Sequence, residues 1–394
     1  MREVYIVSAV RTPIGSFGGS LSTLSATQLG AAAIKAAVER SGIKPEYVNE
    51  VFMGNVLQAN EGQAPVTQAS IYAGLPDTTS GTTINKVCAS GMKSIMLAAQ
   101  SIALGDNDIV VAGGMESMSN VPYYLDKARN GYRMGNGQLI DGMVKDGLWD
   151  VYKDFHMGNA TEMCAAKYNI TREAQDAFAI ESYKRSSSAH DKGLFNDEII
   201  PVSVPVRGKD PVIVNTDEEY KNIKLDKVSA LKPAFQKDGT ITAANSSKLS
   251  DGASALVLMS KEKCEELGLK PLAKIRSYAD AQVEPEWFSV APSKALPLAA
   301  KKAGVAISDI EYFELNEAFA AQSLGRTRQL GLLDDDPRVN PNGGAIALGH
   351  PLGASGARLV MTAVNQLHRS KAKRAITTMC IGVGQGIAML IERV

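Results

Sequence analysis

The chain has 394 residues, of which 45% are hydrophobic and 21% charged, enough for two or three domains around a large buried core. Its 42 basic and 42 acidic residues cancel, so no overall field favours nucleic acid or an anionic membrane surface. No run approaches the roughly 20 apolar residues that a spanning helix needs, which argues against a membrane role.

The spacing of the cysteines and the first ten residues both bear on the cellular compartment of the protein. Cys88, Cys164, Cys264 and Cys380 lie far apart, with no paired spacing and no histidine at metal-ligand spacing, so free thiols in a reducing environment are expected. The first ten residues form a strand pattern and resemble neither a secretory signal nor an Arg-rich transit peptide. We therefore expect a cytoplasmic protein, or a mitochondrial matrix protein whose transit peptide has been removed.

The first third of the chain alternates strands with helices. A strand at 4–10 precedes an Ala-rich helix at 26–40 that Gly42 closes, and a second strand at 50–54 ends at Asn55. After a Gly/Pro loop the pattern continues with three more elements: a strand at 82–87, a helix at 89–104 closed by Gly105, and a strand at 108–112.

Cys88 lies at the turn between the strand at 82–87 and the apolar helix at 89–104. Unpaired N–H groups and the dipole at a helix N-terminus favour a thiolate, so this position predicts a lowered thiol pKa and a nucleophile. The plainer interpretation is that Cys88 is a small buried apolar residue.

The last third repeats the order of the first. A helix at 294–302 stops at Gly304, and a strand at 310–315 ends at Asn316. Asn55 precedes Cys88 by 33 residues and Asn316 precedes His350 by 34. This spacing predicts an internal duplication, two similar α/β domains packed face to face, although two unrelated β-α-β segments remain an alternative.

The region between the two copies differs from them in composition, with aromatic, methionine and charged residues, and we interpret it as an insertion. It contains a helix at 172–192, opened by Thr171, and a charge run at 217–227. The predicted domains are residues 1–118 with 250–270 returning to them, the inserted loop domain 119–249, and residues 271–394.

If the copies pack about a pseudo-twofold axis, Cys88 of one faces His350 of the other. His350 lies among glycines and next to Pro351, and a neutral imidazole within reach would take the thiol proton. Cys380 ends a strand and precedes the alternating glycines 382–386, whose free N–H groups suit an oxyanion.

Five ordered motifs together resemble the thiolase family over essentially the whole chain: NKVCASGMKS, GGMES, NEAF, GGAIALGHPLGASGAR and CIGVGQG. The resemblance implies the duplicated five-layer α/β/α/β/α core with an inserted loop domain. Further stretches in the insertion resemble the short-chain branch, which condenses two acetyl-CoA molecules to acetoacetyl-CoA.

The resemblance also implies residue roles. Cys88 would be acylated, His350 would activate it and hold the thioester oxygen, and Cys380 would move the α-proton of the second substrate. Asn316, through a water, would complete the oxyanion site of His350, and the N–H groups of Cys88 and Gly382 would form a second oxyanion hole.

By resemblance the inserted region would bind coenzyme A, with no tightly bound cofactor. Its predicted contacts are Ser247 to pantetheine, His156 and Met157 at the thioester, and Asn222, Lys224 and Lys227 near the phosphates, although a solvated charge run explains the last three equally well. A potassium site is implied by five matching positions, the first of which also counts among the coenzyme A contacts: Tyr183, Ala243, Ala244, Ser246 and Ile346.

Two other functions are alternatives on the same fold. A decarboxylating enzyme of ketoacyl synthase type pairs its cysteine with two histidines, but this chain has Cys380 where the second would stand. A non-catalytic acyl-CoA-binding or scaffold protein would not need both thiols. A homotetramer is expected from the resemblance, with acetyl-CoA, acetoacetyl-CoA and CoA as ligands and no nucleic acid or membrane partner.

Overall fold

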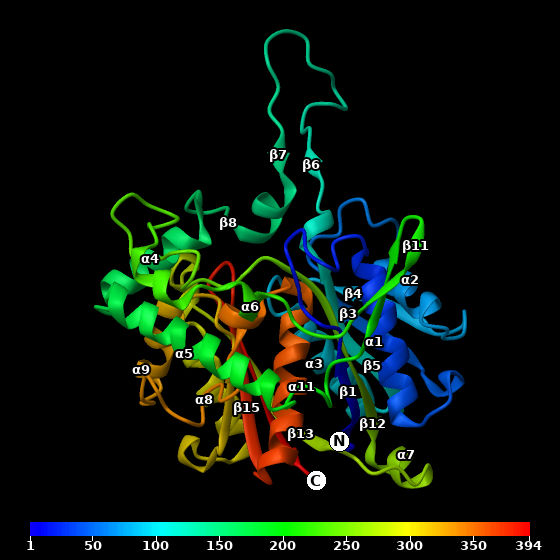
Figure 1. Ribbon diagram of the computed structural model, residues 1–394. Helices are drawn as coiled ribbons and strands as arrows, with labels where there is room; N and C mark the ends of the chain where they lie inside the picture. Colours follow the sequence, from blue (N-terminus) through cyan, green and yellow to red (C-terminus); the bar gives the residue numbers. More distant parts are fainter.

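The computed structural model describes residues 1–394 and contains two similar series of elements (Figure 1), which differ in that only the first has a strand between its second and its last helix. The first copy consists of β1 (Val4–Arg11), α1 (Ala26–Ser41), β3 (Glu50–Gly54), α2 (Pro65–Tyr72), β4 (Ser80–Ile84), α3 (Ser90–Leu104), β5 (Ile109–Ser117) and β12 (Ser250–Ser260). The second copy consists of β13 (Ala273–Gln282), α8 (Pro292–Ala303), β14 (Tyr312–Leu315), α9 (Ala320–Gln329), α10 (Ala345–Leu348), α11 (Leu352–Ser370), β15 (Arg374–Ile381) and β16 (Gln385–Arg393).

Strand pairing confirms the duplication. The sheet order is β14-β15-β16-β13-β1-β12-β5-β3-β4, with the short β2 (Gly15–Ser16) beside β12. Strands β4, β3 and β5 run parallel in the first half, and β14 and β15 run parallel in the second. In each half the next two strands pair antiparallel. The halves join where β1 pairs with β13 through Tyr5–Lys274 and Ile6–Ala273.

The hydrophobic clusters define five layers. Helices α3 and α11 lie between the two half-sheets and share one cluster of 31 buried residues with the inner faces of both. Helix α1 covers the outer face of the first half-sheet through a second cluster, and α8 covers that of the second half-sheet through a third. This arrangement is the predicted α/β/α/β/α core.

Glycines let α3 and α11 approach each other closely. A Cβ on Gly91 would lie 2.7 Å from the carbonyl oxygen of Gly353, and a Cβ on Gly356 would lie 2.5 Å from the amide nitrogen of Met92. Both distances are too short for any larger residue, so these positions need glycine. The crossing fixes the two helix N-termini relative to each other.

The turn before α3 differs slightly from the prediction. Strand β4 ends at Ile84 instead of Val87, because the chain leaves the sheet and Val87 takes a left-handed φ of 46°. The side chain of Ser90 closes this turn by donating to the Val87 oxygen at 2.6 Å and accepting from the Lys86 N–H at 2.8 Å. A β-branched residue in this region is strained, as is often found at functional sites.

One stretch, Val87–Leu104, is apolar and long enough by composition to cross a membrane, so the expectation that no run approaches this limit was wrong. In this structure it contains α3, which packs between the half-sheets. A central core helix meets the same criteria of length and hydropathy.

Residues 118–249 lie between β5 and β12, which are antiparallel neighbours inside the sheet, so the chain leaves and re-enters the sheet at the same end of its strands. They form β6 (Tyr123–Tyr124), β7 (Ile140–Asp141), β8 (Trp149–Asp150), β9 (Phe155–His156), α4 (Met157–Lys167), α5 (Arg172–Asp191), β10 (Val202–Val206), β11 (Lys209–Val214) and α6 (Glu219–Asn222). In Figure 1 the chain between β6 and β7 projects from the body as a long extension. The exact domain boundaries stay a prediction.

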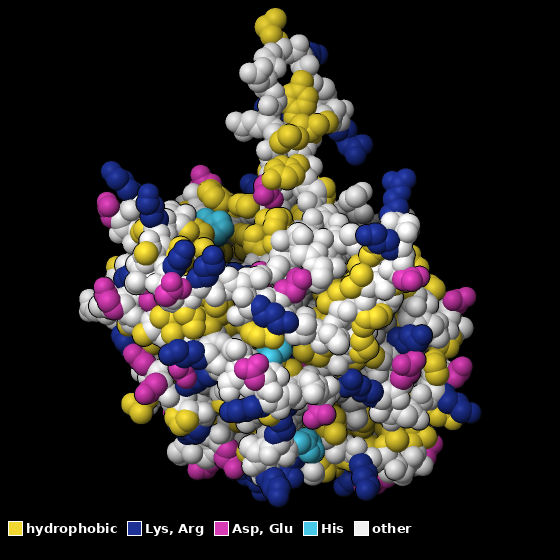
Figure 2. All heavy atoms as spheres, in the orientation of Figure 1, with side chains coloured by type: hydrophobic (Ala, Val, Ile, Leu, Met, Phe, Trp, Pro, Cys, Tyr) yellow, Lys and Arg dark blue, Asp and Glu magenta, His cyan; other side chains and the backbone are white.

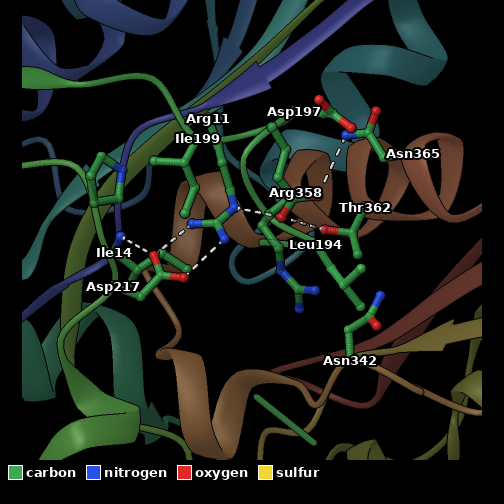
Figure 3. A network of polar contacts seen from close by, with 12 residues as sticks. Arg11, Ile14, Leu194, Asp197, Ile199, Asp217, Asn342, Arg358, Thr362 and Asn365 are labelled. Carbon is green, nitrogen blue, oxygen red and sulfur yellow. Dashed lines mark hydrogen bonds and ion pairs between the residues drawn. The ribbon is translucent and has the colours of Figure 1, made fainter. Parts of the chain in front are cut away.

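A buried ion-pair network fastens the insertion to the core (Figure 3). Arg11 of β1 donates to Glu198 at 2.9 Å and to both oxygens of Asp217 at 2.6 and 2.9 Å. Asp217 also accepts from the Ile14 N–H at 2.8 Å and lies 3.0 Å from Nε2 of His190. These charges are paired as buried charges must be, so the insertion and the core share one polar anchor.

Candidate active site

The predicted catalytic residues converge on one cavity. Cys88 precedes α3, His350 precedes α11, Cys380 lies near the end of β15, and Gly382 lies in the turn to β16. All four line a cavity of roughly 360 Å³. Figure 2 shows a hollow with apolar side chains beside the base of the β6–β7 extension. Residues of both copies therefore meet at one cavity.

The imidazole of His350 is held in one tautomer. Its Nδ1 lies 2.6 Å from Oγ of Ser355, and this hydroxyl donates to the Pro351 oxygen at 2.9 Å. Nδ1 must therefore donate, which leaves the lone pair on Nε2, 3.3 Å from Nδ2 of Asn316. Burial, together with the charge of Arg358, lowers the pKa of His350 to about 3, so the ring is neutral and carries its lone pair at Nε2.

The thiol of Cys88 does not have the lowered pKa that its helix N-terminus predicted. Burial raises the pKa of Cys88 to about 11, although the backbone N–H groups of Gly382 and of Cys88 itself act in the opposite direction. Loss of hydration outweighs the helix N-terminus here, and a sequence does not show that loss. The resting group is therefore a thiol that needs a base.

Cys380 is almost fully buried, and burial with the neighbouring Cys88 raises its pKa to about 12. The guanidinium of Arg326, on α9, opposes this shift. Arg326 is itself buried, donates from Nη1 to the Asn316 oxygen at 3.0 Å, and has no partner for Nε. A positive charge thus lies behind the second thiol, in a position that sequence reasoning did not predict.

Three of the predicted coenzyme A contacts also line the cavity, namely His156, Met157 and Ser247. His156 caps α4 by accepting from the Gly158 N–H at Nδ1, 3.0 Å away, and stacks on Phe235 with ring centres 4.8 Å apart. Burial lowers the pKa of His156, so this ring is neutral as well.

Comparisons with known proteins agree with this geometry. The profile of the thiolase N-terminal domain matches residues 4–262, and that of the thiolase C-terminal domain matches residues 269–393. The chain belongs to the thiolase family. A decarboxylating enzyme of another family and a non-catalytic scaffold are therefore not supported.

Relatives of this thiolase are similar over their whole length. An acetyl-CoA acetyltransferase of Schizosaccharomyces pombe is 54% identical over 393 residues, covering 100% of this chain and 99% of the relative. A cytosolic acetyl-CoA acetyltransferase from Gibberella zeae is 54% identical, covering 99% of this chain and 98% of the relative. A mitochondrial one from Xenopus laevis is 53% identical, covering 100% of this chain and 92% of the relative.

Solved structures of two thiolases superpose closely on this chain. The Bacillus anthracis acetyl-CoA acetyltransferase has a TM-score of 0.97 at 40% identity and covers 100% of this chain and 99% of its own. The Acat5 thiolase from Ascaris suum, solved in complex with coenzyme A, has a TM-score of 0.95 at 45% identity and full coverage of both chains.

The phosphate contacts predicted for this thiolase lie outside the cavity. Asn222, Lys224 and Lys227 are exposed on α6 and the following turn. Nδ2 of Asn222 donates to Oγ of Ser16 at 3.3 Å. Their role in binding the nucleotide stays a prediction.

The residues predicted to bind potassium in this thiolase do not all have oxygen atoms free to bind an ion. Tyr183 and Ile346 share one apolar cluster, and Ala244 is buried. The carbonyl oxygens of Ala243 and Ser246 accept hydrogen bonds from Nζ of Lys248.

This ammonium group conflicts with a bound potassium ion. Burial lowers the pKa of Lys248 to about 8, so it stays mostly charged at neutral pH. A second unit charge about 4 Å from it would be opposed by about 4 kcal/mol at an effective dielectric constant of about 20. With Lys248 in this position, the residues do not fit a potassium ion.

Sequence reasoning missed several groups that shape the site of this thiolase. Ser355 follows His350 by five residues at the start of a helix, and this spacing was a usable signal. Glu116 is buried between the copies and accepts from Nδ2 of Asn55 at 3.1 Å and from the Gly353 N–H at 2.8 Å. The apolar lining gave no signal; it includes Met118, Met143, Leu148, Phe235, Leu249, Phe288, Phe319 and Leu352.

Proposed function

We propose that this thiolase is an acetyl-CoA C-acetyltransferase, which condenses two acetyl-CoA molecules to acetoacetyl-CoA and CoA and catalyses the reverse thiolysis. The observation that carries the proposal is the convergence of two thiols and one neutral imidazole, from opposite copies, on one cavity. Relatives similar over their full length bear the name of this activity.

The first half-reaction acetylates Cys88. Nε2 of His350 takes the proton from Sγ, and the thiolate attacks the thioester carbon of acetyl-CoA. The oxygen that becomes negative is held by the protonated His350 together with a water on Asn316, whose Oδ1 is buried without a partner. The carbon–sulfur bond then breaks, and the departing CoA thiolate takes the proton of Cys380.

The second half-reaction forms the new carbon–carbon bond. The Cys380 thiolate removes an α-proton from the second acetyl-CoA, and the resulting carbanion attacks the acetyl carbon on Cys88. The N–H groups of Cys88 and Gly382 receive the oxyanion, each such donor being worth about 2.7 to 4 kcal/mol. Cys88 leaves as thiolate and regains its proton from His350, which balances the cycle.

The substrates are coenzyme A thioesters, with no tightly bound cofactor in the proposed reaction. His156 and Met157 contact the thioester end and Ser247 the pantetheine arm. Tyr183 lies behind this wall, and Asn222, Lys224 and Lys227 provide polar and cationic groups toward the phosphates. The apolar lining near the thiols suits a short acyl chain.

Paired cysteine variants test the function. With acetoacetyl-CoA and CoA the wild type should consume the enolate absorbance of the substrate. Cys88→Ala should lose both this activity and covalent acetylation, whereas Cys380→Ala should still accept an acetyl group but fail to condense. Cys264→Ala is the control, because this buried sulfur lies outside the cavity and donates to the oxygen of Leu269, five residues further along the chain. A Cys380→Ala protein that condenses at the full rate would remove the proposed base.

We further propose a homotetramer located in the cytoplasm or, after loss of a transit peptide, in the mitochondrial matrix. The β6–β7 extension supports self-association because it exposes several large apolar side chains: Tyr123, Leu125, Met134 and Leu139. Sedimentation of the purified chain and of a variant with this extension shortened would test the assembly.

A further inference from the structure

The loop from Ala243 to Lys248 forms one wall of the cavity and also positions the catalytic base. Ala243, Ser246, Ser247 and Lys248 all line the cavity. The loop is fixed at its C-terminal end by two adjacent backbone contacts. The Ser247 N–H donates to the Ala318 oxygen at 2.9 Å, and the Lys248 oxygen accepts from the His350 N–H at 3.0 Å. The shape of this loop therefore sets the position of His350.

The side chain of Lys248 folds back onto the loop that carries it. Nζ donates to the carbonyl oxygen of Ala243 and to that of Ser246, the latter at 3.4 Å. It also lies 5.9 Å from the centre of the Tyr183 ring, within the range of a cation–π contact. The one charged side chain that acts on this ammonium is Glu219, which lies on α6.

These contacts are the surroundings of a monovalent cation. Backbone carbonyl oxygens converge on the positive charge, and no carboxylate forms an ion pair with it. Converging carbonyl dipoles repel one another unless a cation lies between them. The hydroxyl of Tyr183 is buried nearby without a partner, so the enclosure is polar beyond what the lysine itself uses.

We propose that the Lys248 ammonium is a tethered monovalent cation that replaces a bound potassium ion and keeps the Ala243–Lys248 loop in its binding shape. The kinetic consequence of this inference rests on the proposed function. The reaction of the wild type is then independent of potassium, because the charge that the loop needs is supplied by its own side chain.

Two substitutions separate the charge of Lys248 from its volume. Lys248→Ala removes the charge and leaves room for an ion, whereas Lys248→Met removes the charge but fills the space. Lys294→Ala, an exposed position on α8 without side-chain hydrogen bonds, is the matched control. Each protein is assayed for thiolysis in KCl, NaCl and choline chloride at equal ionic strength, and its melting temperature is measured in the same salts.

We expect wild type and Lys294→Ala to give equal rates and melting temperatures in all three salts. Lys248→Ala should raise KM for acetoacetyl-CoA about fivefold or more without potassium, at the lower end of typical couplings between sites. Potassium should restore this KM and raise the melting temperature of this variant, because an ion that binds only the folded state stabilises it. Lys248→Met should show the defect without the rescue.

Two results would overturn the inference: a wild type whose rate or melting temperature rises in potassium relative to the other salts, or a Lys248→Ala protein that ignores potassium in both measurements. A wild-type protein without thiolysis activity would instead contradict the proposed function. The melting temperatures would then still decide whether Lys248 stands in for the ion.

Discussion

Oγ of Ser355 lies 2.6 Å from Nδ1 of His350, and the same hydroxyl donates to the oxygen of Pro351. The single proton of the serine is used in the second contact, so the first must be donated by the imidazole. A backbone carbonyl in the turn between His350 and α11 thus determines which ring nitrogen can act as the base.

Substituting Ser355 should therefore impair chemistry more than binding. Ser355→Ala frees Nδ1, so the ring no longer holds its lone pair at Nε2. We expect kcat to fall by up to about 100-fold, within the range that general bases contribute, with KM nearly unchanged. Ser355→Thr keeps the hydroxyl and should recover much of the rate. A parallel loss of kcat and melting temperature in both variants would show a merely structural role.

Arg326 should act on the second half-reaction. Its charge lowers the pKa of the Cys380 thiol, and each pKa unit lost corresponds to about 1.4 kcal/mol, about a tenfold change. Arg326→Met should slow condensation by about that factor or more while the acetylation of Cys88 stays fast. Arg326→Lys should retain part of the rate.

Rapid-quench measurement of the acetyl-enzyme separates the two steps. The control is Arg328→Met, two residues further along α9, where the exposed guanidinium pairs with Asp334 at 2.7 Å. If Arg326→Met slowed acetylation as much as condensation, the guanidinium would not act through Cys380.

The acid limb of the pH profile should lie far below the ordinary histidine range. A free histidine has a pKa of about 6.5, whereas that of His350 is lowered to about 3, so the base form persists as the pH falls from 8 to about 5. We expect kcat/KM for acetylation to stay level across this window, with circular dichroism confirming the fold at each pH. A tenfold decline centred near pH 6.5 would contradict the buried neutral imidazole.

The anchor of the insertion should be costly to break. Asp217→Asn leaves Arg11 partly uncompensated in the interior, and we expect a loss of about 3 to 5 kcal/mol in the free energy of unfolding. Asp334→Asn breaks an exposed pair with Arg328 and should cost less than about 1 kcal/mol. Urea denaturation of both variants compares them, and equal midpoints would show that the buried network contributes no more than a surface pair.

The sequence predicted those parts of the site in which the two copies repeat equivalent residues at nearly equal spacing. Asn55 and Asn316 end equivalent strands, and Cys88 and His350 follow them at nearly equal spacing, so the repeat alone predicts that Cys88 and His350 lie together. Helix ends were predictable for the same local reasons, since Gly42, Gly105 and Gly304 all take the left-handed conformation after their helices.

What the sequence could not show depends on contacts between distant segments. Arg326 and Arg328 stand two residues apart in one helix, yet one is buried behind Cys380 and the other is exposed. The helix N-terminus at Cys88 was predictable, but the burial that raises the thiol pKa was not. The contacts of Lys248 were likewise not predictable, because the direction of its side chain follows from the folded loop.

The glycine crossing of α3 and α11 also limits how this enzyme moves. With backbone atoms already in contact at Gly91 and Gly353, the two halves cannot rotate about a hinge without separating the very residues that meet in the cavity. Breathing motions that admit and release a bulky thioester must then arise in the inserted region alone, so turnover and the mobility of that region should vary together with temperature.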